Sequence, residues 1–235
     1  MQAFLSSNPV LYVFVCLAVF VVTFLLGSIP WGLIISKVFY GIDIRKCGSG
    51  NIGTTNAMRS MGKAGGIAVF LLDFAKGILS GAIAFAASCT LFSSSAFNGV
   101  NFTNIMLGIS FYGCVLGHIF SPWLKFRGGK GIAVAIGCLF VVFGVCGAVL
   151  ELAIFAVLVL VTKYVSVGSI ASAAACPFIA AYYFLYASFS PLAWFFVSAG
   201  ACFVLWAHRS NMARLRAGNE RKIGSSKHGK HEGAK

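Results

Sequence analysis

Repeated apolar runs, each long enough to cross much of a bilayer, constrain the fold of this chain more than any other feature of its sequence. A bilayer core of about 30 Å is crossed by roughly 20 residues of helix. Of the chain, 59% is hydrophobic and only 10% is charged, whereas soluble domains carry charge on about a quarter of their residues. The sequence therefore predicts an all-α, polytopic integral membrane protein. Its apolar runs cover residues 11–35, 65–92, 102–123, 132–162, 171–185 and 192–206.

The run at 132–162 decides the topology, because it can form either one tilted helix or two short helices that meet near Gly144. Two crossings place Lys163 on the same side as Lys130, whereas one long helix would place it on a side without other cations. We therefore expect about seven transmembrane helices. On this count every Lys and Arg except Lys76 lies on one side, which predicts an N-out, C-in orientation.

The two ends of the chain are expected to differ in character. Residues 1–14 lack the basic region and the cleavage site of a secretory signal peptide, so the first apolar run is expected to be a retained span. Residues 1–223 are predicted to form a single transmembrane domain, and residues 224–235 a basic, disordered tail. The uncharged loop at 93–98 is expected to lie on the outer side.

The most polar interruption in the middle of the chain is GHIFSPWLKFRGGKG, residues 117–131. Gly128, Gly129 and Gly131 have no Cβ atom, so their backbone N–H groups can approach an anion closely, and Lys130 adds a positive charge. This combination suits phosphate. The alternative is that the cations of this loop are only the positive-inside cluster of a cytoplasmic connection.

The longest predicted inside loop, residues 36–64, contains the sequence CGSGNIGTTNAMRSMG. Its glycines alternate with small hydrogen-bonding residues, a pattern that can fold around an oxyanion. These hydrogen-bonding residues are Ser49, Asn51, Thr54, Thr55 and Asn56, of which Asn56 is a candidate N-cap of a short helix that carries Arg59. The alternative is a flexible turn with an interfacial arginine.

Ionisable residues also occur where the bilayer should be. Asp73 and Lys76 are three residues apart and share one helix face, which should face protein and not lipid. We favour a structural ion pair that braces the loop above it over a catalytic role. His118, at the expected end of a helix, is likewise predicted to be a structural hydrogen-bonding group and not a base.

Two further inner segments carry groups that bind oxyanions. KYVSVGSI contains Ser166 and Ser169, which could equally be helix caps. HRSN places His208 and Asn211 on one helical face, and the basic residues around them suit an interfacial helix that binds anionic headgroups. Because four inner segments separated in sequence each offer such groups, we expect them to converge on a cationic pocket at the membrane surface.

Several classes of function are disfavoured by what the sequence lacks. It has no Ser-His-Asp arrangement, no H-E-x-x-H helix and no clustered Cys/His site, so covalent and metal catalysis are not expected, and neither is a cofactor. The eight cysteines are scattered singly, and we interpret them as buried thiols and not as ligands or disulfides. In a membrane protein the net charge of +13 favours a membrane surface or an anionic substrate over nucleic acid.

Six blocks of the chain, in order, resemble the bacterial acyl-phosphate:glycerol-3-phosphate acyltransferases, the PlsY family. The blocks are GSIPWGLIISK, GSGNIGTTNAMR, LLDFAKG, GHIFSPWLKFRGGKG, YVSVGSI and HRSN with RLRAGNERKIG. Ile52 and Thr54 stand where proline and alanine are common in the family, but neither change removes a polar group. The resemblance implies a seven-helix enzyme of the bacterial cytoplasmic (inner) membrane whose active site faces the cytoplasm.

The implied reaction moves a fatty acyl group from acyl phosphate to the 1-hydroxyl of sn-glycerol 3-phosphate, the first committed step of membrane phospholipid synthesis. Its products are lysophosphatidic acid and phosphate. The acyl chain would lie between helices that are open to the membrane lipid, and a soluble enzyme that produces acyl phosphate would be a functional partner. Two readings from other classes remain, a membrane transporter of a phosphorylated or anionic solute and a non-catalytic scaffold.

Carried over residue by residue, the resemblance implies catalytic roles for Lys130, Arg59, His208 and Ser49. A larger set would bind phosphate or shape its pocket: Ser49, Asn51, Asn56, Arg59, Gly128, Gly129, Lys130, Gly131, Ser169, His208 and Asn211. Ser166 replaces Ser169 if the motif is displaced by three residues. The general base is either His208 or a phosphate oxygen of the substrate, and we favour the phosphate-assisted route.

Overall fold

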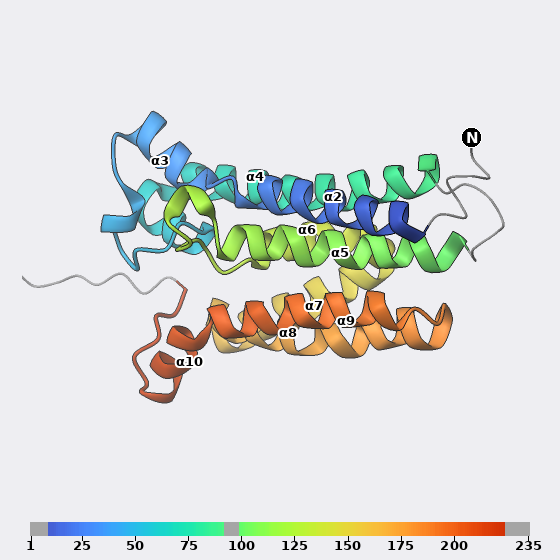
Figure 1. Cartoon of the computed structure of the whole chain (residues 1–235). Helices are drawn as coiled ribbons and strands as arrows, with labels where there is room; N and C mark the ends of the chain where they lie inside the picture. The colour runs from blue at the N-terminus through green and yellow to red at the C-terminus, as the bar shows by residue number, and fades with distance from the viewer. Residues whose placement is uncertain (1–8, 92–98, 224–235) are drawn as a thin grey trace, which may run out of the picture.

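The computed structural model describes residues 9–91 and 99–223, and every regular element within them is helical. The long helices lie side by side along roughly one direction (Figure 1). The predicted all-α fold is confirmed. The α-helices are α2 (Pro9–Ser28), α3 (Trp31–Tyr40), α4 (Thr54–Leu91), α5 (Gly99–Ile119), α6 (Ile132–Val142), α7 (Gly144–Thr162), α8 (Val165–Ala181), α9 (Pro191–Ala207) and α10 (Arg209–Arg216). Shorter helices are η1 (Ile44–Lys46), η2 (Pro122–Leu124) and the π-helix η3 (Tyr182–Ala187).

The predicted membrane character is also confirmed, since several helical segments are long and apolar enough to cross a bilayer. Among residues 9–91 and 99–223, five segments meet this criterion on their own: Val10–Tyr40, Thr54–Leu91, Phe102–Leu124, Gly144–Thr162 and Val165–Ala187. Together, α9 and α10 make a sixth candidate with a 49° bend. Helix α6 has 11 residues, about 16 Å at 1.5 Å per residue, and is too short to cross alone. The count of seven and the N-out, C-in orientation stay predictions.

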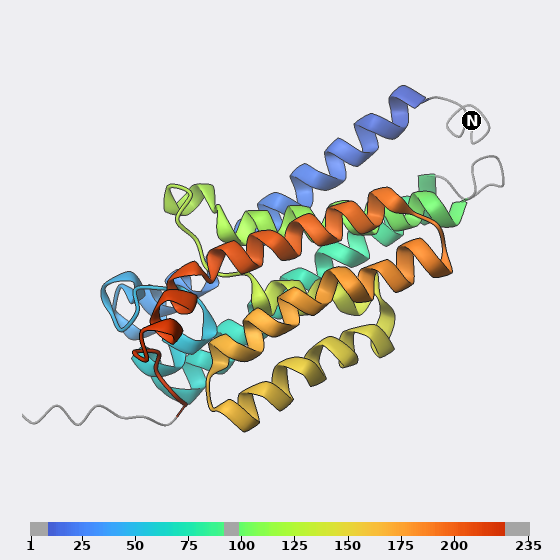
Figure 2. The same cartoon turned by 90° about the horizontal axis from the view of Figure 1, so that it is seen from below.

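The apolar run at 132–162 forms two helices, as predicted. Helix α6 ends at Val142 and α7 begins at Gly144, whose φ of 68° is a left-handed value that favours glycine. Figure 2 shows α7 running back in the direction opposite to α6. The start of α6 and the end of α7 therefore lie at the same end of the bundle.

Cationic segments collect at this end, because successive long helices run in opposite directions (Figures 1 and 2). The end holds α3 with the loop to α4, the start of α4, the loop from α5 to α6, the turn from α7 to α8, and α10 with the segment after it. All described Lys and Arg residues except Lys76 belong to these segments. The fold thus brings together the loops in which the sequence predicted oxyanion-binding groups.

Some boundaries differ from the predicted ones. The first span breaks at Pro30 but continues as α3 to Tyr40, so less of the predicted inside loop is irregular. Helix α4 begins at Thr54 and bends at Gly62, which has φ 74° and ψ −174°. Helix α8 begins at Val165 and not near 171, because its serines are buried against neighbouring helices at positions that hydropathy alone scores as polar. The predictions for residues 1–8, 93–98 and 224–235 lie outside the described residues.

The cysteines only partly match their prediction. All eight are free thiols, and Cys114, Cys138 and Cys176 are buried. Others, among them Cys89 and Cys202, are exposed on the outer surface of helices. The prediction of burial was wrong for these, because an apolar helix that faces lipid has the same composition as one that faces protein.

Candidate active site

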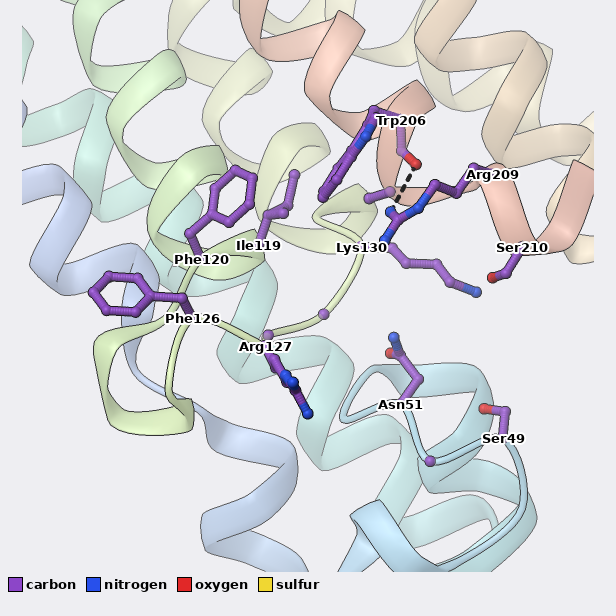
Figure 3. Close-up of a pocket in the computed structure, with 14 residues that line it drawn as sticks. Ser49, Asn51, Ile119, Phe120, Phe126, Arg127, Lys130, Trp206, Arg209 and Ser210 are labelled. Carbon is purple, nitrogen blue, oxygen red and sulfur yellow. Dashed lines mark hydrogen bonds between the residues drawn. The ribbon is translucent and has the colours of Figure 1, made fainter.

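A cavity of about 370 Å³ opens at the cationic end of the bundle. Three segments far apart in the sequence contribute its walls, and Figure 3 shows the side chains of Ser49, Asn51, Lys130 and Ser210 around the same space. The residues that line it are Ser49, Gly50, Asn51, Ile119, Phe120, Phe126, Arg127, Gly128, Gly129, Lys130, Trp206, Ala207, Arg209 and Ser210. One side is therefore polar and cationic, and the other is aromatic.

The first wall is the loop that carries Lys130. The N–H of Gly128 donates to the carbonyl of Ile119 at 2.9 Å, and the N–H of Gly129 donates to the carbonyl of His118 at 3.0 Å. The sequence predicted that these two amides would face an anion, and this was wrong because they bind the end of α5 instead. Gly131 follows with φ 89° and is the N-cap of α6. The N–H groups and the dipole at this helix start favour an anion beside Lys130.

Asn56 holds the second wall in place from behind. Its Oδ1 accepts from the N–H of Ser49 at 2.8 Å. Its Nδ2 lies 2.8 Å from the carbonyl oxygen of Asn51, 3.0 Å from that of Cys47 and 3.3 Å from that of Ile44. Asn56 lies in the first turn of α4, which begins at Thr54, so the predicted N-cap role was wrong. It shapes the loop that presents Ser49 and Asn51.

The third wall is the junction of α9 and α10. His208 stands at this junction, is buried, and its Nδ1 lies 2.8 Å from the carbonyl oxygen of Val204. A carbonyl oxygen can only accept, so Nδ1 carries the hydrogen. The guanidinium of Arg209 lies 3.8 Å from the centre of the Trp206 ring and donates to the Trp206 carbonyl at 3.2 Å. This stacking holds Arg209 at the edge of the cavity (Figure 3).

Sequence reasoning missed the role of Glu220, which lies beyond α10. Its carboxylate accepts from Arg214 Nε at 2.6 Å and from Asn211 Nδ2 at 2.7 Å. The N–H of Ile223 donates to the carbonyl of Lys163 at 2.8 Å, which ties the same segment to the turn between α7 and α8. The chain contains only five acidic residues, and an isolated one in a basic tail was a signal that could have identified it.

The charges of these residues act on one another. Burial, and then the charges of Arg214 and Arg59, lower the pKa of Lys130 to about 8, while Glu220 opposes the shift. Burial alone would raise the pKa of Glu220, but the hydrogen bonds from Arg214 and Asn211 lower it. The surroundings of Lys130 are thus a cluster of cations that Glu220 only partly compensates, and an anion that enters the cavity is stabilised.

The other predicted site residues lie around the cavity without lining it. Arg59 is exposed on α4 and lies within electrostatic reach of Lys130. Ser166 and Ser169 are buried one turn apart near the start of α8, where Tyr164 and neither serine is the N-cap. The predicted buried pair exists, since Lys76 Nζ lies 2.7 Å from Asp73 Oδ1.

The chain is similar to known proteins along nearly its whole length. Residues 17–218 match the family described as glycerol-3-phosphate acyltransferase. The glycerol-3-phosphate acyltransferase of Thermosynechococcus vestitus is 38% identical over 87% of this chain and 93% of the relative. That of Desulforamulus reducens is also 38% identical, with the same coverage. The crystal structure of PlsY, an integral membrane glycerol 3-phosphate acyltransferase, in its glycerol 3-phosphate form has 31% identity and a TM-score of 0.74 over 89% of this chain and 96% of that one. Its lysophosphatidic acid form has a TM-score of 0.73.

Proposed function

Because the chain belongs to the glycerol-3-phosphate acyltransferase family, we propose that it transfers a fatty acyl group from acyl phosphate to the 1-hydroxyl of sn-glycerol 3-phosphate. The products are lysophosphatidic acid and inorganic phosphate. The observation that carries this proposal is the mixed lining of the cavity. Lys130, Arg127 and Arg209 offer charge for phosphate, and Phe120 and Trp206 offer an apolar surface for an acyl chain.

The chemistry requires little beyond positioning and charge. The hydroxyl oxygen of the acceptor forms a bond to the acyl carbonyl carbon, the bond from that carbon to the bridging phosphate oxygen breaks, and the hydroxyl proton passes to a phosphate oxygen. Negative charge develops on the leaving phosphate, which Lys130 and the N-terminus of α6 are placed to stabilise. Ser49 and Asn51 orient the substrates from the opposite wall, and Arg59 adds a further positive charge within electrostatic reach of Lys130.

His208 is a poor candidate for the general base. It is buried and is not among the residues that line the cavity. Its Nδ1 is committed to Val204, so only Nε2 could take a proton. A phosphate oxygen of the substrate is present in the cavity whenever the reaction occurs, and it serves as the acceptor in the route that we favour. His208, Asn211 and Ser169 then support the walls.

The cation distribution supports a location in the bacterial inner membrane with the cavity on the cytoplasmic side. On that side the cavity is accessible to soluble glycerol 3-phosphate and to acyl phosphate supplied by a soluble enzyme. A cavity at one end of the bundle also suits an enzyme better than a transporter, whose site would lie near mid-depth.

The test uses the purified full-length protein in detergent with acyl phosphate and glycerol 3-phosphate. We expect release of inorganic phosphate that depends on the acceptor, together with an equal amount of lysophosphatidic acid. Acyl-CoA in place of acyl phosphate reports on the donor. Phosphate release no faster than in the enzyme-free blank would reject the proposal, and a transporter would be silent because no sealed compartment is present.

A further inference from the structure

Three buried ionisable or polar residues form a cluster where α4 and α5 meet below the Lys130 loop. Asp73, Lys76 and His118 are only 2%, 3% and 4% exposed, and none of them lines the cavity. Burying charges costs free energy unless they are paired and hydrogen-bonded. Their contacts therefore indicate what the cluster holds in place.

Lys76 joins three separate parts of the fold. Its Nζ lies 2.7 Å from Asp73 Oδ1, 2.9 Å from the carbonyl oxygen of Ile29 and 3.0 Å from His118 Nδ1. Ile29 stands at the break between α2 and α3. Because an ammonium group only donates, His118 Nδ1 accepts, and the neutral imidazole carries its hydrogen on Nε2. Lys76 thus fixes both the orientation and the tautomer of the ring.

The His118 ring in turn supports Gly129. A Cβ atom at position 129 would collide with Nε2, and its three nearest neighbours would all be atoms of this ring. The backbone of Gly129 also binds the His118 carbonyl at 3.0 Å. Its φ is not left-handed, so the need for glycine at 129 comes from the close approach of His118 and not from an unusual backbone conformation.

We propose that His118, oriented by Lys76 and Asp73, is a positioning residue. Its ring sets how closely the loop from Gly128 to Lys130 approaches the end of α5, and so places the Lys130 ammonium in the cavity. This inference rests on the proposed function, in which Lys130 binds substrate phosphate. The Asp73–Lys76 pair then acts on the reaction through His118 and contacts no substrate.

The geometry gives a sharp test in the form of a double-mutant cycle. His118→Asn keeps an oxygen acceptor near the position of Nδ1 for Lys76 but removes the ring from below Gly129. Gly129→Ala pushes the loop away from α5 only while the His118 ring is present, because the added Cβ atom collides with that ring. Each single change should therefore weaken the binding of glycerol 3-phosphate by about ten-fold or more. The double variant should bind no more weakly than His118→Asn alone, so the two effects should be strongly non-additive. Ser110→Ala is the matched control and should bind normally, because Ser110 is also buried on α5 and its hydroxyl donates to the Leu107 carbonyl, with only a long 3.8 Å contact to Cys138 Sγ.

Binding is measured by calorimetry with glycerol 3-phosphate and with inorganic phosphate on the folded, full-length protein in detergent, with the melting temperature recorded for each variant. Additive losses in the cycle would overturn the proposal, because the ring would then not be what the loop rests on. Wild-type dissociation constants in His118→Asn, with only a lowered melting temperature, would equally overturn it and leave a purely structural role. A wild-type protein that binds glycerol 3-phosphate but forms no lysophosphatidic acid would instead count against the proposed function, since the cycle does not depend on turnover.

Discussion

Arg214 Nε donates a 2.6 Å hydrogen bond to Glu220 Oε2 and thereby fixes the segment after α10 against the cationic end of the bundle. Asn211 binds the other carboxylate oxygen at 2.7 Å. The Glu220 side chain is 10% exposed and that of Arg214 is 41% exposed, so the pair is only partly screened by water. This ion pair therefore affects both the stability of the fold and the charge around the cavity.

Glu220→Gln should lower both stability and activity. The variant leaves Arg214 and Asn211 facing an amide, which should cost about 1–3 kcal/mol of folding free energy. It also removes the one charge that raises the pKa of Lys130, so less of the lysine is charged at pH 8. The measurements are the melting temperature in detergent and the rate of phosphate release.

Asp43→Asn is the control for this prediction, because Asp43 pairs with Arg45 two residues along the same loop, so this ion pair does not tie distant segments together as the Arg214–Glu220 pair does. Local ion pairs at the surface contribute little to folding stability. A drop in melting temperature as large in Asp43→Asn as in Glu220→Gln would contradict the role assigned to Glu220.

The pKa of Lys130, about 8 in the unliganded protein, predicts a loss of kcat/KM at alkaline pH. The charged ammonium is the form that binds phosphate, and it is lost as the pH rises through this value. Bound phosphate favours the charged form, so kcat at saturating substrate should fall only at a higher pH. The measurement is a profile of kcat and kcat/KM from pH 6.5 to 9.5, corrected for spontaneous hydrolysis. Lys130→Arg, which stays charged, should remove the alkaline limb, and an unchanged limb in that variant would assign the titration to another group.

Lys130→Ala and Arg59→Ala should each abolish measurable turnover while the protein remains folded. Removing one group that stabilises developing charge typically costs about 10²–10³ in rate. Lys130 lines the cavity, and Arg59 lies within electrostatic reach of it. Phosphate release is measured beside size-exclusion behaviour and melting temperature. Near-wild-type turnover in either variant would remove that residue from the site.

Two asparagines of one loop should respond differently to the same change. In Asn56→Asp a carboxylate oxygen replaces Nδ2 beside three carbonyl oxygens, which should cost about 1–3 kcal/mol of stability. In Asn51→Asp the acceptor for the N–H of Gly53 is kept, so the melting temperature should hold. The new negative charge at the cavity wall should instead raise KM for glycerol 3-phosphate. The same loss of stability in both variants would refute the distinction between a scaffold and a lining residue.

Sequence reasoning identified the features that depend on local pattern. The helices, the break before α7, the Asp73–Lys76 pair and the position of Lys130 at a cavity follow from hydropathy, spacing and charge within short windows. These signals need no knowledge of which helices touch.

What it missed depends on contacts between segments. The backbone N–H groups of Gly128 and Gly129 were expected to be free for an anion, but they donate to carbonyls at the end of α5. Asn56 looked like a cap, but its partners are carbonyls up to twelve residues away in the chain. The sequence assigned no role to Glu220, and its role becomes visible only once α10 places Arg214 beside it. Hydrogen-bond partners of this kind are set by tertiary structure and leave no periodic trace.

The close contact between α4 and α6 fixes the position of α6 and, with it, the position of the Lys130 loop that precedes α6. A Cβ at Gly77 would collide with the carbonyl of Val134, and a Cβ at Gly137 would collide with the carbonyl of Phe74. The two helices therefore approach backbone to backbone, as small residues allow in membrane proteins. Gly77→Ala should push α6 away, lower the melting temperature, and raise KM because α6 begins two residues after Lys130. Ala82→Val adds bulk to the exposed face of the same helix and should be tolerated. If Gly77→Ala melted and turned over like Ala82→Val, the close approach of α4 and α6 would not be what fixes the position of the site.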